Sequence, residues 1–177
     1  NRQNYFNLNP PGSQWSMFVG SSSGNSVKRL LPVDGVYALR VYLMRAAGRR
    51  GETSRFTMNV SLSGEPLAAR PSHIDALIPG TPYHASASIV CAEGAGAPRL
   101  SCESFVIRRG FDGAATLEIR WPGNGSSGIR RILFVKGLPV SSDSTKPLSH
   151  VRQGETTHVR LGDREVFEVP DALIFGG

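Results

Sequence analysis

The most constraining feature of the sequence is the run Tyr37–Met44, in which apolar side chains alternate across two faces. A period of two is that of a β-strand, and since both faces carry apolar bulk, we expect a central strand rather than an edge. The short basic stretch 45–52 follows, and residues 56–62 then repeat the alternation. The pattern predicts a β-hairpin with a cationic loop at its tip.

The loop at this tip is rich in arginine. Arg45, Arg49 and Arg50 stand within six positions, and arginine donates hydrogen bonds in a planar fork that matches a carboxylate. Arg45 and Arg49 are four residues apart, so one helical turn would direct both side chains the same way. Entry into an acidic cleft and a merely solvated loop are the two interpretations that this pattern leaves open.

Composition favours an all-β fold of many short strands. The 177 residues include 20 Gly and 12 Pro, and no long segment has the helical period of 3.6. No apolar run approaches the roughly 18 residues that a membrane-spanning helix needs. The first residue is Asn and no signal peptide is recognisable, so we expect a mature, cleaved or partial chain.

Proline-rich residues 64–82 lack strand-like alternation and predict a linker. We therefore expect a first domain over residues 1–63 and a second β domain over 83–177. A helical turn over 72–77 is expected in the linker, with Ser72 as its cap and Asp75 three residues later. Outside the central hairpin, strands are predicted at 15–19, 27–31, 83–91, 103–109, 115–121, 129–135, 157–161 and 165–169, with an Asn124-Gly125 turn and a loop at 140–144.

Cys91 and Cys102 are the only cysteines. One even pair in a chain expected to be exported predicts a disulfide that closes a loop of about a dozen residues. Two free thiols forming a metal or redox pair are the alternative, although the Cys-x-x-Cys spacing of such pairs is missing.

The net charge of +6 favours an acidic partner. Nucleic acid is not expected, because the basic residues are scattered and no recognition helix is apparent. The four histidines lie far apart, and neither a Gly-x-Ser-x-Gly elbow nor a phosphate-binding loop occurs. We therefore expect no metal, no cofactor and no enzymatic activity.

Residues 1–62 resemble the bacterial periplasmic inhibitors of goose-type (g-type) lysozyme, which are small antiparallel β-sandwich proteins. The matching segments, in order, are Asn4–Asn7, Pro10–Ser13, Gly20–Asn25 and Tyr37–Glu52. The resemblance implies that Arg45 and Arg49 enter the lysozyme cleft and pair with its catalytic glutamate. The partner-binding residues expected on this basis are Arg45, Arg49, Arg50, Tyr42, Asn4 and Tyr5. The chain departs from the family at Gly48, where alanine is expected, and lacks about two strands that precede the Asn-Tyr-Phe-Asn motif in the family.

Residues 83–177 resemble an uncharacterised exported domain of proteobacteria. The cysteine pair, the basic strand Val106–Arg109 and the terminal Val169–Ala172 followed by Phe175-Gly176-Gly177 carry this resemblance. It implies export to the periplasm or beyond and a β fold, but no activity.

Two functions are therefore expected from the sequence. The first is a periplasmic or secreted inhibitor of a g-type lysozyme. The alternative is a non-catalytic structural or accessory subunit of a cell-envelope protein assembly. In either case a sandwich without the further strands exposes a sheet edge, which would allow strand-sharing with another chain or with a separate N-terminal segment.

Overall fold

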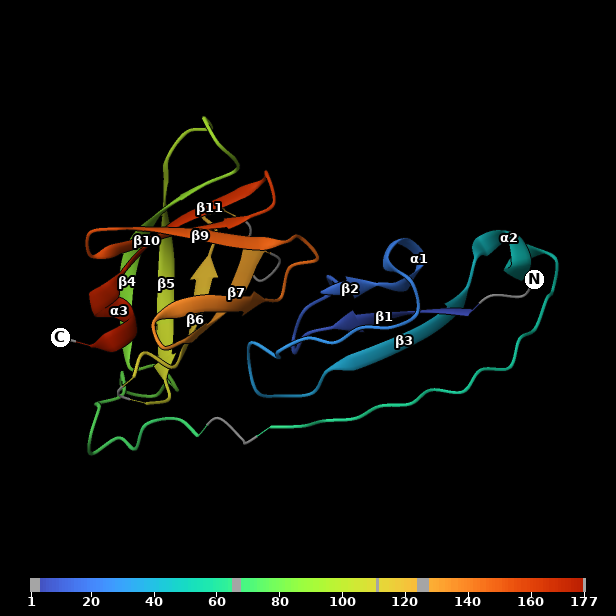
Figure 1. Cartoon of the computed structure of the whole chain (residues 1–177), viewed down its shortest axis with the longest axis horizontal. Helices are drawn as coiled ribbons and strands as arrows, with labels where there is room; N and C mark the ends of the chain where they lie inside the picture. The colour runs from blue at the N-terminus through green and yellow to red at the C-terminus, as the bar shows by residue number, and fades with distance from the viewer. Residues whose placement is uncertain (1–3, 65–67, 111, 124–127, 177) are drawn as a thin grey trace.

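The computed structural model of the chain is all-β, with every strand pair antiparallel, which confirms the predicted class. It describes residues 4–64, 68–110, 112–123 and 128–176. The strands form a three-stranded sheet and an eight-stranded sheet, which occupy opposite ends of an elongated molecule (Figure 1). The predicted Asn124-Gly125 turn lies outside the described residues.

The smaller sheet is built from residues 4–43. Its strands are β1 (Asn4–Asn9), β2 (Phe18–Val19) and β3 (Ala38–Leu43), and the one-turn helices α1 (Gly20–Ser23) and α2 (Arg45–Arg49) follow β2 and β3. β1 lies in the middle, so that Tyr5 faces Tyr42 and Asn7 faces both Arg40 and Val19. The strand predicted at 15–19 is present only as β2.

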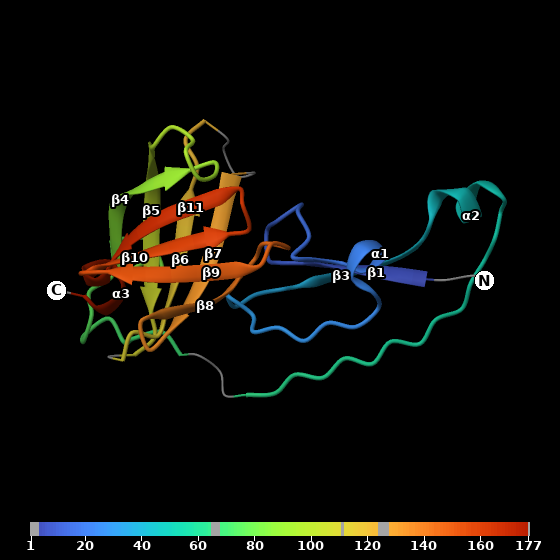
Figure 2. The ribbon, with the colours of Figure 1, turned by 45° about the horizontal axis from the view of Figure 1, so that its top comes forward.

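β3 is an edge strand, so the prediction of a central strand is wrong. Among the described residues its only partner is β1, and residues 38–40 are exposed. Residues 56–62 run from α2 back towards the large sheet in an extended form but join no strand (Figures 1 and 2). The second arm of the predicted hairpin is therefore also wrong, because alternation decides which side chains share a face but not which backbone pairs with which.

The larger sheet is strongly curved. Its order is β8-β7-β6-β5-β4-β11-β10-β9, and the two end strands contact each other. Its elements are β4 (Ala85–Ala92), β5 (Leu100–Arg108), β6 (Ala115–Arg120), β7 (Ile129–Val135), β8 (Leu138–Ser142), β9 (Leu148–Gln153), β10 (Thr156–Leu161), β11 (Glu165–Pro170) and the terminal α3 (Asp171–Phe175). The concave side encloses a core that includes Leu117, Ile119, Phe134, Leu161 and Phe167, all fully buried.

The loop predicted at 140–144 is wrong, because β8 covers most of it. β7 and β8 are joined by the two-residue turn Lys136-Gly137, in which both residues have positive φ (53° and 74°). This conformation is the favoured connection of a tight hairpin. A glycine is required at the second position for another reason as well, since a Cβ on Gly137 would lie 2.3 Å from the Phe175 ring.

Residues 29–34 attach the small sheet to the large one, and we call them the junction. The strand predicted at 27–31 is wrong, because this segment pairs with no strand and its backbone carbonyls accept hydrogen bonds from side chains of the large sheet instead. Three hydrogen bonds define the attachment: Arg29 Nη1 to the Ser144 carbonyl (2.7 Å), Ser141 Oγ to the Leu30 carbonyl (2.7 Å) and Thr116 Oγ1 to the Pro32 carbonyl (2.6 Å). The junction leaves α2 at the far end of the small sheet (Figure 1).

Asp75 fastens the chain segment that leads into β4. Its carboxylate accepts from Arg108 Nη1 at 3.0 and 3.1 Å and from Arg70 Nη1 at 3.3 Å. Arg108 also donates to the carbonyls of Ala172 and Leu173 in α3. Asp75, expected in the first turn of a helix capped by Ser72, instead forms ion pairs, and residues 72–74 form only a turn.

Cys91 and Cys102 form the predicted disulfide across β4 and β5. Both are buried in the core of the large sheet. The alternative of two free thiols is wrong.

Reduction of this disulfide is expected to lower the free energy of unfolding by about 2–3 kcal/mol, because the open loop regains conformational freedom in the unfolded chain. Urea unfolding with and without reductant measures the loss. A Cys91→Ala/Cys102→Ala variant serves as the control, since its unfolding must not respond to reductant. An unchanged midpoint in the reduced wild type would contradict the prediction.

Candidate functional site

The basic loop is folded as the single helical turn α2, which begins at Arg45 and ends at Arg49. The spacing of four residues within one turn is the arrangement that the sequence suggested for these two side chains. Both are exposed, and neither guanidinium forms a hydrogen bond or an ion pair with the described residues. Two cations without partners are therefore held close together at one end of the molecule.

Tyr5 and Tyr42 lie behind this turn, on the end of the small sheet that leads into it. They occupy facing positions on β1 and β3, and their ring centroids are 6.1 Å apart. Asn4 faces Leu43, one position closer to α2. All six predicted partner-binding residues therefore lie at α2 or on the strand ends next to it, with Arg50 as the C-cap of α2.

Asn4 ties the two ends of the loop together. Its side-chain nitrogen donates to Ser54 Oγ and to the Arg55 carbonyl, both at 3.0 Å. Its own carbonyl accepts from the Asn25 side chain at 2.6 Å. These contacts join residues 21 to 51 positions apart, so no local sequence signal could have identified Asn25 or Ser54.

Arg50 differs from the other two arginines because it is already paired. Its Nε lies 2.6 Å from Glu52 Oε1, at an exposed position. An exposed pair of this kind contributes little to stability, but it keeps the Arg50 charge turned back onto the loop. Arg45 and Arg49 are thus the two cations of α2 that remain available to a partner.

The small sheet and its loops are strongly basic. Residues 4–64 contain seven Lys or Arg and two Asp or Glu, a net charge of +5 out of +6 for the whole chain. The remaining residues are therefore close to neutral. The positive field favours an acidic partner at this end of the molecule.

No family model, curated protein or solved structure matches this chain. The two resemblances drawn from the sequence therefore stay predictions.

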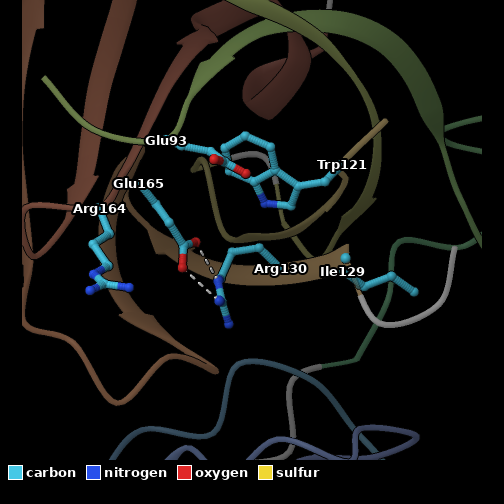
Figure 3. Close-up of a pocket in the computed structure, with 7 residues that line it drawn as sticks. Glu93, Trp121, Ile129, Arg130, Arg164 and Glu165 are labelled. Carbon is cyan, nitrogen blue, oxygen red and sulfur yellow. Dashed lines mark hydrogen bonds and ion pairs between the residues drawn. The ribbon is translucent and has the colours of Figure 1, made fainter. Parts of the chain in front are cut away.

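A cavity of about 410 Å³ opens at one end of the large sheet. Its lining comprises Glu93, Trp121, Gly128, Ile129, Arg130, Arg164 and Glu165 (Figure 3). Arg130 donates to both Glu165 oxygens at 2.8 Å and to Asp143 at 2.7 Å. Burial by itself lowers the pKa of Arg130. The hydrogen bonds and charges of these two carboxylates outweigh the effect of burial and raise the pKa above its ordinary value. The Arg130 charge is therefore neutralised by carboxylates of the protein itself.

Glu118 is the centre of a second charged cluster, on the outer side of the large sheet. Its carboxylate accepts from the Tyr83 hydroxyl (2.9 Å), from Arg120 (2.9 Å) and from Arg131 (3.1 Å). Arg131 in turn donates to the Pro11 carbonyl of the small sheet. The cluster thus adds to the attachment made by the junction.

Burial, together with the charge of Glu118, raises the pKa of the Tyr83 phenol above its ordinary value of 10.0. As pH rises, the Tyr83 phenol therefore loses its proton at a lower pH in the unfolded chain than in the folded one. The free energy of unfolding is expected to fall as pH rises above about 10. Urea unfolding at about pH 9 and about pH 11 measures the fall. A Tyr83→Phe variant should lose less stability over this interval, and an equal loss in both proteins would contradict the prediction.

Within the described residues, no group of three or more His, Cys, Asp or Glu side chains is placed to hold a metal ion. No helix among them is long and apolar enough to cross a bilayer.

Proposed function

We propose that this protein binds and inhibits a g-type lysozyme by inserting α2 and its flanking residues into the enzyme's cleft. Arg45 and Arg49 pair with the catalytic glutamate, and Tyr5 and Tyr42 contact the rim of the cleft. Inhibition of this kind requires no chemistry from the inhibitor, only a preorganised loop that excludes substrate.

The pair of exposed, unpartnered guanidinium groups on one helical turn is the observation that carries this proposal. Planar guanidinium forks are suited to carboxylate recognition. The loop is preorganised by Asn4, so that little conformational entropy is lost when it docks. The resemblance of residues 1–62 to the inhibitor family supplies the identity of the partner.

The proposal also assigns a compartment. A buried disulfide is favoured in an oxidising environment, which agrees with a bacterial protein that is periplasmic or secreted. G-type lysozymes attack peptidoglycan in that same compartment.

Lysis of a peptidoglycan suspension by a purified g-type lysozyme tests the proposal. The rate is expected to fall as the protein is added and to recover as salt is raised, because exposed charge pairs are screened. A lysozyme of another structural class should be unaffected. Undiminished lysis at a large excess of folded protein would overturn the proposal.

A second function, that of a non-catalytic accessory subunit of a cell-envelope assembly, is favoured by a different observation. The large sheet and α3 make up more than half of the chain, yet the arginine loop lies at the far end from them (Figure 1). Crosslinking in the intact envelope distinguishes the two functions. A stable partner that survives Arg45→Ala/Arg49→Ala substitution would support the accessory function, and the absence of any such partner would contradict it.

A further inference from the structure

We propose that the cavity at the end of the large sheet binds a short peptide with two free ends, such as a dipeptide. A ligand of this class is a zwitterion, with an ammonium group at one end and a carboxylate at the other. The site is separate from the arginine loop and stands whether or not that loop binds a lysozyme.

The cavity lies at the open end of the curved sheet. Its lining residues follow the last residues of β4 and β6 or stand at the starts of β7 and β11. α3 follows the end of β11 and covers the other end of the sheet, where Leu173 and Ile174 join the buried core (Figure 1). The open end of a strongly curved sheet is a common position for a ligand site, and about 410 Å³ suits a small molecule.

Trp121 gives the cavity a fixed aromatic wall. Its ring packs against Phe167, with the ring centroids 5.5 Å apart, and its backbone N–H donates to the Gly128 carbonyl at 2.8 Å. The side chain is only half-buried, and its indole N–H has no hydrogen-bond partner among the described residues. The indole therefore offers apolar surface to a ligand side chain and one donor to a peptide carbonyl.

Arg130 and Glu165 form a second wall, in which the charges are already paired. Arg130 donates to both Glu165 oxygens at 2.8 Å, and Figure 3 shows this pair between Trp121 and Arg164. A bidentate pair is rigid and leaves neither charge free for a ligand. This wall therefore shapes the cavity without selecting a ligand of one sign.

Glu93 and Arg164 carry the two charges of the cavity that are free. Both side chains are exposed, and neither forms a hydrogen bond or an ion pair with the described residues. They adjoin neighbouring strands, since β4 ends at Ala92, which faces Val166 of β11. Neighbouring strands lie about 5 Å apart, and the two ends of an extended dipeptide are roughly 7 Å apart, a distance that two long side chains can span.

This combination of charges indicates which ligand fits. A ligand with only a negative charge would pair with Arg164 but would meet the free carboxylate of Glu93, and a ligand with only a positive charge would meet the reverse. A zwitterion pairs with both side chains at once. A dipeptide also supplies an apolar side chain and a carbonyl for Trp121, so it uses every free group named in the cavity.

Alanyl-phenylalanine is the probe, and the fluorescence of Trp121 is the readout. The chain has two tryptophans, and Trp15 is 67% exposed, so a Trp15→Phe background leaves Trp121 as the only emitter without disturbing the core. The dipeptide is expected to change the emission in a saturable way, with a matching affinity by titration calorimetry. N-acetylation or C-terminal amidation of the probe should each weaken binding about tenfold, which corresponds to about 1.4 kcal/mol.

Two substitutions assign the two ends of the ligand. Glu93→Gln is expected to weaken binding of the free dipeptide about tenfold but to leave binding of its N-acetyl form unchanged, because the ammonium group that Glu93 would recognise is already missing. Arg164→Gln should have the same relation to the amidated form. Both side chains are exposed and unpaired, so neither substitution should disturb the fold.

Glu155→Gln and Arg160→Gln are the matched controls. Glu155 is exposed and directly precedes β10, at the end of the sheet that α3 covers. Arg160 is exposed between the buried Val159 and Leu161, so it lies on the outer face of β10. Both controls should bind the free dipeptide within a factor of about two of the wild type.

Three results would overturn the proposal. The first is no saturable binding of the free dipeptide, by fluorescence and by calorimetry, up to about 10 mM. The second is equal binding of the free and the blocked dipeptides, since the two charges would then not be recognised. The third is an equal loss in the controls and in the cavity variants, which would assign the effect to net charge.

Discussion

Replacing Arg45 and Arg49 with alanine is expected to weaken inhibition of a g-type lysozyme by about thirtyfold or more. Removing one member of a charge pair that is desolvated on binding typically costs about 2–5 kcal/mol, and each 1.4 kcal/mol is a factor of ten. Both side chains are exposed and unpaired in the free protein, so the substitutions should not disturb its fold. Titration of lysozyme activity against wild type and variant measures the change.

Arg160→Ala/Arg164→Ala is the matched control for this variant. It removes two exposed arginines from the large sheet and its adjoining turn, where neither has a partner among the described residues, and it lowers the net charge equally. Inhibition by this control should stay within a factor of about two of the wild type, since exposed charges away from an interface contribute mainly through a screened field. Arg50→Ala should have an intermediate effect because Arg50 is paired with Glu52. If the control and the loop variant lose inhibition equally, net charge rather than the loop is responsible.

Replacing Asp75 with alanine is expected to lower the free energy of unfolding by about 3–5 kcal/mol. The substitution leaves the guanidinium of Arg108, whose side chain is only 7% exposed, without its carboxylate. An uncompensated buried charge is far more costly than the net contribution of the intact pair. Urea unfolding of the full chain measures the loss.

Asp163→Ala is the control for the Asp75 variant, because Asp163 is exposed and has no side-chain partner among the described residues. The Asp163→Ala substitution should change the free energy of unfolding by no more than about 0.5 kcal/mol. The loss in free energy of unfolding for Asp75→Asn should lie between those of Asp75→Ala and Asp163→Ala, since an amide still accepts a hydrogen bond but carries no charge. A loss below about 1 kcal/mol for Asp75→Ala would show that Arg108 finds water once its partner is gone.

The sequence predicted the elements whose pattern is local. β5, β6, β7, β10 and β11 lie within a few residues of their predicted positions, since each combines alternation with flanking turn residues. The disulfide followed from there being only two cysteines. α2 could be suggested because the spacing of Arg45 and Arg49 suits a single turn.

The missed elements depended on information that is not local. β8 contains Pro139, which argues against a strand, but β8 is an end strand of the sheet, where a missing backbone donor is tolerated. β9 is almost wholly exposed and therefore has no apolar alternation to recognise. That residues 56–62 join no strand could not be predicted, because period-two patterning does not specify a neighbour.

In the candidate site, residue type and spacing in the sequence identified the arginines. The side chains that hold the arginine loop in place were identified only from the fold. Asn4 was expected from the resemblance as a partner-binding residue, and its bonds to Ser54 and Arg55 give it a role in holding the loop. Asn25, which holds Asn4 in turn, became visible only when distant parts of the chain were brought together.

The course of the chain between its two sheets has a consequence for its integrity. Residues 56–62 are part of the covalent connection, yet they are exposed and unbonded, whereas the junction 29–34 holds the same two sheets together by non-covalent contacts, namely hydrogen bonds and the Arg109–Asp34 ion pair. A protease that cut within 56–62 would produce two fragments that stay associated in native buffer and separate only in denaturant. The molecule is in this sense a natural split protein, with its complementation interface already built into the uncut chain.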